Sequence, residues 1–376
     1  MRVGRPESGS GSGGLRRVRG RPPPARETIG AMSEPSSHNQ SRSRRPRPGR
    51  LGVGIVSAGR VGAVLGSALR AVDHRVVGVH AVSEASRERA EMLLPGVPVL
   101  EVEQVVRRAE LVLLAVPDDE LAGLVGGLAD VGAWRAGQLV VHTSGRYGAD
   151  VLAPAQRAGA VPIALHPAMT FSGYSTDVAR LAGCPMAVTA PAAFLPVGQA
   201  LAVELGGEPF VLEEGARPAY HAALAHGANH LVTLVGQAVR ALEAAGVGDG
   251  AATLRPLLTA ALDRALREGA DAALTGPVAR GDAGTVRAHL EALGALRDPG
   301  AGGPLEDVVE GYRAMAAATV ERRAATGRLD PTRAAALRDA LGGGPGDPGP
   351  GPAGPGPAGP GPGGSGPGAR PGTVGS

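Results

Sequence analysis

A short run of small residues near position 57 has the residue types that hold a dinucleotide. It reads Gly54-Ile55-Val56-Ser57-Ala58-Gly59-Arg60-Val61-Gly62, so the G-x-G-x-x-G pattern would fall on positions 57, 59 and 62. A glycine at 59 lets the backbone approach a pyrophosphate, and one at 62 lets a helix pack closely on a strand. A helix starting near Arg60 would offer free N–H groups to the phosphates. The candidate cofactor-binding residues here are Ser57, Ala58, Gly59, Arg60, Val61 and Gly62.

The first glycine of the pattern is replaced by Ser57. That glycine serves the tight turn after the strand, and a serine can be tolerated in its place if its φ stays negative. The order of strand, turn and helix is otherwise the one that the pattern requires. The run therefore predicts a dinucleotide site, with an empty domain of the same fold as the alternative.

The segment after the second expected strand bears on the choice of cofactor. NAD-binding domains place Asp or Glu at the end of this strand, where it binds the ribose hydroxyls. Here Ser83, Ser86 and Arg87 can donate hydrogen bonds to a 2′-phosphate. This favours NADP(H), with NAD(H) as the alternative, because Glu84 could take the ribose. Equally, Ser83 could cap the next helix and Arg87 could lie on a solvated face.

Two further strand ends carry candidate ligand contacts. Val116 and Pro117 end one strand, and Thr143 and Ser144 end the next. Ligands bind at the carboxyl ends of strands in open parallel sheets, so these residues could contact the nicotinamide end of the cofactor or the substrate. Ordinary turn and cap chemistry explains Thr143 and Ser144 equally well.

Three histidines and an asparagine are candidates for catalysis. His226, Asn229 and His230 share one face of an expected long helix, so His226 could act as a general acid while Asn229 orients a carbonyl or carboxamide. The spacing of His226 and His230 also suits a metal, but no third ligand is evident nearby, so we expect none. Interface or capping roles are the alternative. His166 follows a strand and could face the cleft or serve a turn.

One arginine lies in a run of unusual composition in the second half of the chain. The run is Thr275-Gly276-Pro277-Val278-Ala279-Arg280-Gly281-Asp282, which predicts a rigid loop between helices. Arg280 would present a cation suited to a substrate carboxylate or phosphate. The alternative is an Arg280–Asp282 pair that joins two helices.

Apolar periodicity gives the elements that must position these residues. Short apolar runs typical of strands buried on both faces are 51–56, 75–82, 111–116, 139–142, 161–165, 186–190 and 209–212. Helical patterns fall between or after them at 61–71, 86–93, 119–129, 192–205, 218–245, 251–268, 283–293, 304–325 and 331–341. The fold class is therefore α/β, a Rossmann-type, mostly parallel sheet followed by an all-helical C-terminal domain.

The same patterns divide the chain into four parts. We expect a disordered basic tail over 1–50, a dinucleotide-binding domain over 51–215, a helical substrate and dimerisation domain over 216–341, and a disordered Gly/Pro-rich tail over 342–376. The first 50 residues resemble an organelle transit peptide in being Arg-rich, but the simpler interpretation is that Met32 is the true start and 1–31 an over-extended reading frame.

Composition excludes several classes of function. Residues 1–50 hold 12 Arg and 3 Glu, which leaves 26 Arg against 32 acidic residues in the rest, so the folded part is acidic and short of stacking aromatics. We therefore expect no specific nucleic-acid partner. No apolar stretch reaches about 18 residues, so we expect no membrane span. The single Cys184 fits a reducing, cytoplasmic location.

These motifs together resemble a known family of Rossmann-like proteins with a C-terminal helical domain of unknown function. The resemblance covers about 51–325 and rests on Ala58–Gly62, His142–Gly145, Leu165–Pro167 with Phe171, Tyr220–Ala223, Asn229 and Thr275–Asp282. The architecture is also similar to that of pyrroline-carboxylate reductase, ketopantoate reductase and enzymes with a 6-phosphogluconate-dehydrogenase-like C-terminal domain. The resemblance implies an NAD(P)-dependent oxidoreductase whose helical domain forms a homodimer and closes the cleft.

The resemblance does not extend to the chemical step. β-Hydroxyacid dehydrogenases and ketopantoate reductase use a lysine, and matching Asn229 to the dehydrogenase asparagine places Ala225 at the lysine position. The chain contains no lysine at all. Two hypotheses follow: an NADP(H)-dependent reductase of a small carboxylate-bearing carbonyl or imine compound, or a catalytically silent dinucleotide sensor or scaffold.

Overall fold

The computed structural model describes residues 50–342. The two predicted disordered tails, apart from their innermost residues, lie outside the described residues, as do Met1 and Met32. Within 50–342, all seven predicted strands are present. They are β1 (Gly52–Val56), β2 (Arg75–His80), β3 (Leu111–Leu114), β4 (Leu139–His142), β5 (Val161–Pro167), β6 (Pro185–Thr189) and β7 (Glu208–Val211).

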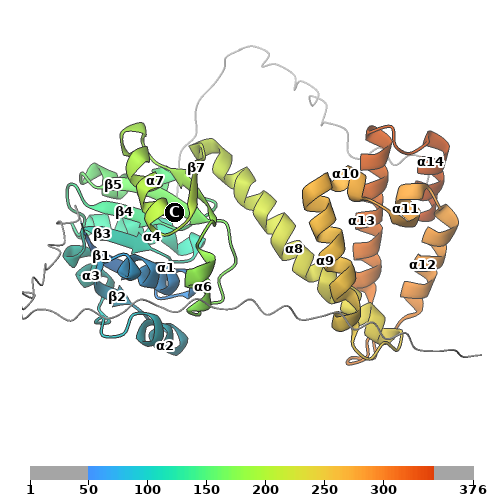
Figure 1. The fold of residues 1–376 in the computed structure, drawn as a ribbon, viewed down its shortest axis with the longest axis horizontal. Coiled ribbons are helices and arrows are strands. Elements are labelled where there is room, and N and C mark those ends of the chain that lie inside the picture. Colours follow the sequence, from blue (N-terminus) through green and yellow to red (C-terminus); the bar gives the residue numbers. More distant parts are fainter. Residues whose placement is uncertain (1–49, 343–376) are drawn as a thin grey trace, which may run out of the picture. The chain divides into compact units, whose positions relative to one another are not determined.

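The strands form one sheet in the order β2-β1-β3-β4-β5-β6-β7 (Figure 1). β1 to β5 are parallel to one another, β6 is antiparallel to β5, and β7 is parallel to β6. This confirms the predicted mostly parallel sheet. The chain places β2 on one side of β1 and β3 on the other, so the strand order reverses there. In open sheets of this kind, ligands bind at the carboxyl ends of the strands beside that point.

Helices cover both faces of the sheet (Figure 1). They are α1 (Arg60–Ala71), α2 (Glu84–Leu93), α3 (Val102–Arg108), α4 (Asp118–Asp130), α5 (Ala153–Arg157), α6 (Thr176–Arg180) and α7 (Leu195–Glu204). The sequence patterns missed α3, α5 and α6. Each of these helices has at most seven residues, too few to display a helical period.

Two apolar layers hold this part together. Val53 and Ile55 of β1 pack with α1, α2 and α7 on one face of the sheet, while Val56 packs with α3, α4 and α5 on the other. Successive strand residues point to opposite faces, so a strand buried on both sides must be apolar throughout. This is why the seven strands could be found as continuous apolar runs.

After β7 the described chain is helical. The helices are α8 (Arg217–Ala244), α9 (Gly250–Glu268), α10 (Ala270–Ala273), α11 (Gly276–Arg280), α12 (Ala283–Ala295), α13 (Glu306–Ala325) and α14 (Pro331–Ala340). The prediction of a rigid loop over 275–282 was wrong, because Gly276–Arg280 forms α11. Pro277 stands in its first turn, where a proline's missing N–H costs nothing.

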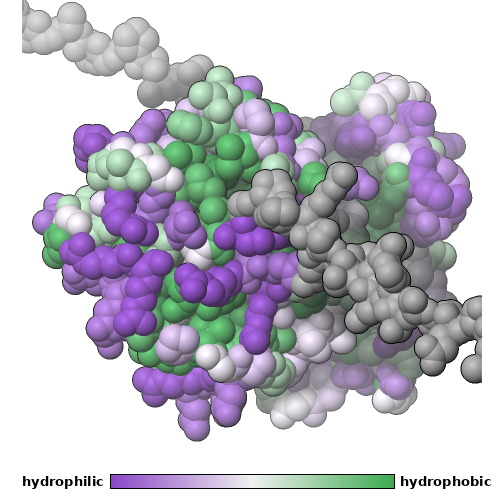
Figure 2. Space-filling view, turned by 60° about the vertical axis from the view of Figure 1, so that its left-hand side comes forward, coloured by the Kyte–Doolittle hydropathy of each residue, from purple (hydrophilic) through white to green (hydrophobic). Residues whose placement is uncertain are grey.

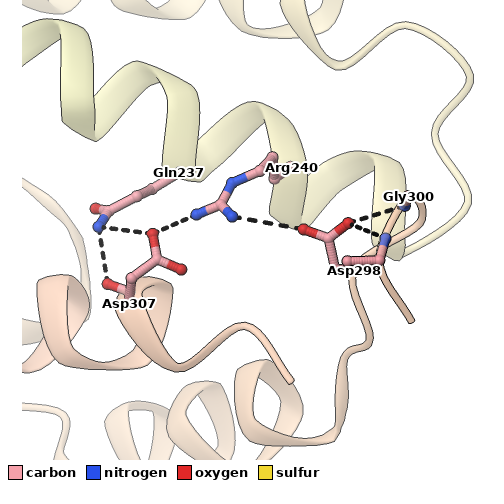
Figure 3. A network of polar contacts seen from close by, with 6 residues as sticks. Gln237, Arg240, Asp298, Gly300 and Asp307 are labelled. Atoms are coloured by element: carbon pink, nitrogen blue, oxygen red, sulfur yellow. Dashed lines mark hydrogen bonds and ion pairs between the residues drawn. The ribbon is translucent and has the colours of Figure 1, made fainter. Parts of the chain in front are cut away.

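A polar network ties the C-terminal half of α8 to the start of α13. The Arg240 guanidinium bridges the carboxylates of Asp298 and Asp307, and Gln237 donates to the Asp307 carbonyl at 2.8 Å (Figure 3). Asp298 in turn accepts from the backbone N–H groups of Gly300 and Ala301 at 2.8 and 3.0 Å. These backbone hydrogen bonds lower the pKa of Asp298. The network is exposed, so its effect on stability is small.

The surface shows no continuous apolar belt on the face drawn in Figure 2, where apolar residues lie in patches separated by hydrophilic side chains. Among the helices of residues 50–342, none combines the length and the apolar character needed to span a membrane.

Candidate functional site

The turn between β1 and α1 has the shape of a dinucleotide-binding turn. A Cβ at Gly62 would lie 2.1 Å from the Ser57 carbonyl oxygen, so only glycine fits there. A Cβ at Gly59 would meet only the Ser57 hydroxyl, at 3.5 Å, and otherwise face open space. The close approach of helix to strand and the open backbone are the features for which the two glycines of the pattern are needed.

Ser57 does not keep the negative φ under which a serine is easily tolerated at this position. Its φ is +76° instead of negative, which places it in the left-handed region that favours glycine. The turn therefore keeps the backbone shape of the full glycine pattern, and the serine adopts it at a conformational cost of about 1 kcal/mol or more.

The amino end of α1 is free to receive an anion. Its N-cap Gly59 has no side chain to cap the helix, and the first turn contains no acidic residue. The Ala58 N–H is already bonded to the His80 carbonyl oxygen at 2.9 Å, which anchors the turn to β2. Free N–H groups, the positive end of the helix dipole and Arg60 at the first helical position fit a pyrophosphate, so this turn could hold a dinucleotide.

The predicted 2′-phosphate residues are partly engaged elsewhere. Ser83 caps α2 by accepting from the Ser86 N–H at 3.2 Å, and the buried Ser86 hydroxyl donates to the Ser83 carbonyl at 2.7 Å. Arg87 is exposed. Gly173 lies against Arg60 of α1 and Arg89 of α2, since a Cβ added to it would lie 3.1 and 3.0 Å from their side chains.

The ends of β3 and β4 carry the other expected cofactor contacts. Val116 is half-buried and Pro117 exposed, directly before α4. Thr143 is half-buried, and its side chain makes no hydrogen bond within residues 50–342. The Ser144 hydroxyl accepts from the N–H groups of Arg146 and Tyr147 at 3.2 and 3.1 Å, which is ordinary turn chemistry.

A pocket of about 340 Å³ lies at the carboxyl end of β5. It is lined by His166 of β5 and Met169 just after that strand, and by His221 and Asn229 of α8. The Tyr220 hydroxyl lies 2.9 Å from Nδ1 of His166, and the two rings meet edge to face with centroids 5.5 Å apart. Gly145 after β4, His166 of β5, and Tyr220 and His221 at the start of α8 therefore lie close together.

Gly145 makes this arrangement fit. A Cβ there would lie 3.0 Å from Nε2 of His166 and 3.0 Å from Cδ2 of His221. A glycine at the end of β4 is therefore what allows both rings to approach the sheet edge.

Arg217, the first residue of α8, is fully buried under the pocket. Its guanidinium donates to the carbonyl oxygens of Ser144, Ala164 and Ala187 at 3.0 to 3.1 Å, and to the Thr189 hydroxyl at 2.9 Å. Burial lowers the pKa of Arg217 to about 10, so it stays charged at neutral pH. The site thus contains a fixed positive charge held by uncharged oxygens.

Two histidines near this charge are neutral at pH 7. Burial lowers the pKa of His166 to about 4, and the charges of Arg217 and His221 act in the same direction while Asp118 opposes them. Burial likewise lowers the pKa of His142 to about 4, partly opposed by its hydrogen bond to the Gly148 carbonyl. His142 accepts from the Ser144 N–H at Nδ1 and faces the Gly148 carbonyl with Nε2 at 2.8 Å, so it shapes the turn.

We expect this neutral state of His142 to make the protein acid-sensitive. The unfolded chain takes up a proton at His142 below about pH 6.5, whereas the folded chain does so only near pH 4. The contribution of His142 to the free energy of unfolding is therefore fully present above pH 6.5. It decreases as the pH drops to about 4, by up to about 3 kcal/mol. Urea unfolding between pH 7 and pH 4 measures the loss. A free energy of unfolding that stays flat over that range would contradict the assignment.

The other sequence candidates are not all brought to the pocket. Asn229 lines it, but His226 is exposed and its Nδ1 lies 2.8 Å from Nδ1 of His230. Among residues 50–342, no group of three His, Cys, Asp or Glu side chains could hold a metal ion. Arg280 is exposed on α11 and does not line the pocket of its own chain. The Asp282 carboxylate caps α12 through Thr285, and no Arg280–Asp282 ion pair forms.

Sequence reasoning missed Tyr220, Gly145 and Arg217. Tyr220 and Gly145 did stand in the motifs that carried the family resemblance, beside His221 and Ser144, and that was the available signal. Arg217 gave none, because an arginine at the start of a helix is usually solvated, and its acceptors are backbone carbonyls of β5, of β6 and of the segment after β4.

The fold and the site define a Rossmann-like protein with a C-terminal helical domain. Two family models match: the Rossmann-like domain over residues 32–167, and the domain of unknown function DUF2520 over residues 184–319. The chain therefore belongs to the Rossmann-like proteins that carry this C-terminal domain. No curated protein matches it.

Solved structures with the same fold cover most of the chain. The "putative NADP oxidoreductase" BF3122 from Bacteroides fragilis has a TM-score of 0.58 and 20% identity, covering 72% of this chain and 98% of its own. A reductive aminase from Aspergillus terreus, in complex with NADPH and ethyl-5-oxohexanoate, has a TM-score of 0.53 and 15% identity over 76% and 98%. An imine reductase from Pseudomonas sp. has a TM-score of 0.52 and 18% identity over 78% and 100%. At these identities the likeness concerns the fold.

Proposed function

We propose that the protein is an NADP(H)-dependent oxidoreductase that reduces a small carbonyl or imine compound bearing a carboxylate. The observation that carries the proposal is the location of two features at the same edge of the sheet. The open turn at Gly59 follows β1, and the pocket around His166 follows β5, which is parallel to it. The similar folds of enzymes described as oxidoreductases and imine reductases support it.

Different residues would bind the cofactor and the substrate. The turn from Ser57 to Gly62 would bind the pyrophosphate, and Arg87 the 2′-phosphate, with Thr143 and the backbone at Val116 and Pro117 near the nicotinamide. When bound, a reduced nicotinamide supplies a hydride to an acceptor carbon. In the pocket, Asn229 would orient the acceptor and His166 would donate a hydrogen bond to its oxygen or nitrogen.

The first test is a fluorescence titration of the protein with NADPH and, separately, with NADH. We expect binding of both and a lower Kd for NADPH, since Arg87 can pair with the 2′-phosphate. Loss of NADPH absorbance is then followed with a panel of ketones, cyclic imines and their carboxylate-bearing analogues. Turnover of at least one compound supports the proposal. Failure to bind either dinucleotide would overturn it.

The proposal that the substrate bears a carboxylate rests on Arg280. It is tested by comparing a carboxylate-bearing acceptor with its neutral analogue. Arg280→Ala should raise the KM for a carboxylate-bearing acceptor and leave that of the neutral analogue unchanged. Equal effects on both acceptors would remove the carboxylate from the substrate class. Arg280 does not line the pocket of its own chain, so its effect would also indicate a contribution from a second copy.

The second candidate function is a dinucleotide sensor or scaffold without turnover. The replacement of the first glycine of the pattern by Ser57 and the absence of any lysine favour it. Under this proposal the protein binds NADPH, no acceptor in the panel oxidises it, and substitution of His166 leaves binding unchanged.

We propose that the helical part forms a homodimer. In a single chain, the 28-residue α8 buries only Arg217 and the 19-residue α9 only Gly250. Leu257 of α9 is 66% exposed and Val232 of α8 is 72% exposed. Leu257 also lines an apolar cavity of about 740 Å³ between α8, α9, α12 and α13. An exposed apolar surface of this extent is typical of an interface between copies.

We expect Leu257→Glu to weaken the dimer at least about tenfold, because it places a charge on that apolar surface. Light scattering after gel filtration at a series of concentrations measures the effect. Val131→Glu is the matched control, since Val131 is 55% exposed at the end of α4, among the helices on the sheet. A monomeric wild type, or equal dissociation of both variants, would contradict the interface.

A further inference from the structure

We propose that Tyr220 and His166 form a proton relay for the reaction in the pocket, with Tyr220 as the proton source and Arg217 as the residue that stabilises the tyrosinate left behind. The inference rests on the proposed function, because it concerns the proton that a reduced carbonyl or imine must receive. It gives the site an acid in a chain that contains no lysine.

The relay pairs Nδ1 of His166 with Tyr220 and leaves Nε2 as the nitrogen available to the substrate. Nδ1 of His166, at 2.9 Å, is the hydrogen-bond partner of the Tyr220 hydroxyl within residues 50–342, and in the proposed relay the phenol donates to it. A neutral imidazole that accepts at Nδ1 carries its proton on Nε2. Nε2 makes no hydrogen bond within the same residues, and His166 lines the pocket. An N–H donor is therefore left over for a ligand.

His166 alone is not a sufficient acid. Because burial and the charges of Arg217 and His221 hold its pKa at about 4, despite the opposing charge of Asp118, the imidazolium is absent at neutral pH. A neutral imidazole gives up its Nε2 proton readily only if Nδ1 gains one at the same time. Tyr220 is the group in position to provide it.

The proton balance of the relay is complete. The Nε2–H bond breaks and the acceptor's oxygen or nitrogen gains that proton as its carbon is reduced. The phenol O–H bond breaks and Nδ1 gains the second proton. His166 remains neutral in its other tautomer, and Tyr220 becomes a tyrosinate. After product release, the pair takes up one proton from the solvent, the net proton consumed in the reduction, and the first tautomer is restored.

Arg217 is placed to stabilise the tyrosinate. Its guanidinium is fully buried one helical turn before Tyr220, and its hydrogen bonds go to uncharged oxygens. The Glu214 carboxylate acts on its charge without a hydrogen bond to it, and accepts instead from the Ala149 and Asp150 N–H groups. Burial raises the pKa of Tyr220, and the charge of Arg217 acts against that rise. Arg217 is thus a positioning and charge-stabilising residue, while Tyr220 and His166 form the relay.

The other acids near this helix are less suitable. His226 is exposed and paired with His230. His221 lines the pocket but has no hydrogen-bond partner within the described residues that could resupply a proton.

The variant that tests the relay is Tyr220→Phe, compared with Tyr312→Phe. The control removes the same kind of bond, since the Tyr312 hydroxyl lies 2.9 Å from Nδ1 of His289 in the helical part. We expect Tyr220→Phe to lower kcat about 100-fold or more and to leave the Kd for NADPH unchanged. Because the relay needs a protonated tyrosine, kcat of the wild type should fall at high pH, and Tyr220→Phe should remove that fall. Tyr312→Phe should change none of these. Unchanged kcat in Tyr220→Phe would overturn the relay.

A second measurement does not depend on turnover. Nitrogen NMR of the histidine rings, with His166→Gln for assignment, should show the Nε2–H tautomer of His166 in the wild type and in Tyr312→Phe, and a mixture in Tyr220→Phe. A wild-type His166 protonated at Nδ1 would overturn the relay even if turnover is found. If no acceptor is reduced although NADPH binds, the proposed function fails, and with it the relay, whatever the tautomer.

Discussion

Gly59→Ala is expected to weaken dinucleotide binding strongly while leaving the fold intact. Gly59 has a φ of −65°, which alanine adopts freely, and a Cβ there would meet only the Ser57 hydroxyl, at 3.5 Å. The cost to folding is about 1 kcal/mol or less, because alanine is a poorer N-cap than glycine. The new methyl group would, however, occupy the open side of the turn at the amino end of α1, where the pyrophosphate would bind. We expect the Kd for NADPH to rise about 10-fold to 100-fold, or about 1.4 to 2.8 kcal/mol.

Gly62→Ala provides the contrast for this prediction. Its Cβ would lie 2.1 Å from the Ser57 carbonyl oxygen and 3.0 Å from the Ala115 Cβ, so the turn must move before any ligand arrives. We expect it to lose stability, by about 1 to 3 kcal/mol, as well as binding. Thermal unfolding and NADPH titration of both variants separate the two effects. If Gly59→Ala binds NADPH as the wild type does, the turn is not the phosphate site.

Ser57→Gly completes this set. Because Ser57 has a φ of +76°, glycine should fit the turn with less strain and stabilise the protein by about 1 kcal/mol. NADPH binding should be retained, since the turn keeps its shape. This variant therefore shows whether a loss of affinity in Gly59→Ala comes from the added methyl group or from general sensitivity of the turn.

Arg217→Met is expected to destabilise the folded protein by about 3 to 5 kcal/mol. Arg217 is fully buried, and its guanidinium satisfies the Ser144 carbonyl oxygen after β4, the Ala164 carbonyl oxygen of β5, and the Ala187 carbonyl oxygen and Thr189 hydroxyl of β6. Methionine fills similar volume but donates nothing, so these oxygens lose a buried partner. Urea unfolding followed by circular dichroism measures the loss.

Arg240→Met is the matched control for Arg217. Arg240 lies on the same helix and contacts two carboxylates, those of Asp298 and Asp307, but its side chain is 40% exposed (Figure 3). We expect it to lose less than about 1 kcal/mol, because water replaces an exposed ion pair at little cost. Arg217→Lys should lie between the two, since it keeps the charge but not the planar fork of donors. Similar losses for Arg217→Met and Arg240→Met would show that the buried network does not hold the strand ends together.

The sequence by itself determined the strands and the long helices of this protein. Strands buried on both faces had to be continuous apolar runs, so all seven were found from local pattern. The 28-residue α8 was found because it is long enough to show its own period. The motif at Gly59 and Gly62 also followed from the sequence, because the need for glycine arises within a few residues of the turn. Short helices such as α3, and α11 in place of a loop, were missed because five to seven residues show no period.

Only the tertiary structure decided how the chemistry-bearing residues meet. His166 and Tyr220 are 54 positions apart and become partners because β5 ends where α8 begins. His226 shares that helix but points elsewhere, and Arg280 stays outside the pocket of its own chain. The burial of Arg217 depends on backbone oxygens of β5, of β6 and of the segment after β4, which no local pattern encodes. Spacing along a chain fixes a residue's own helix or strand face, whereas contacts between elements depend on how those faces pack.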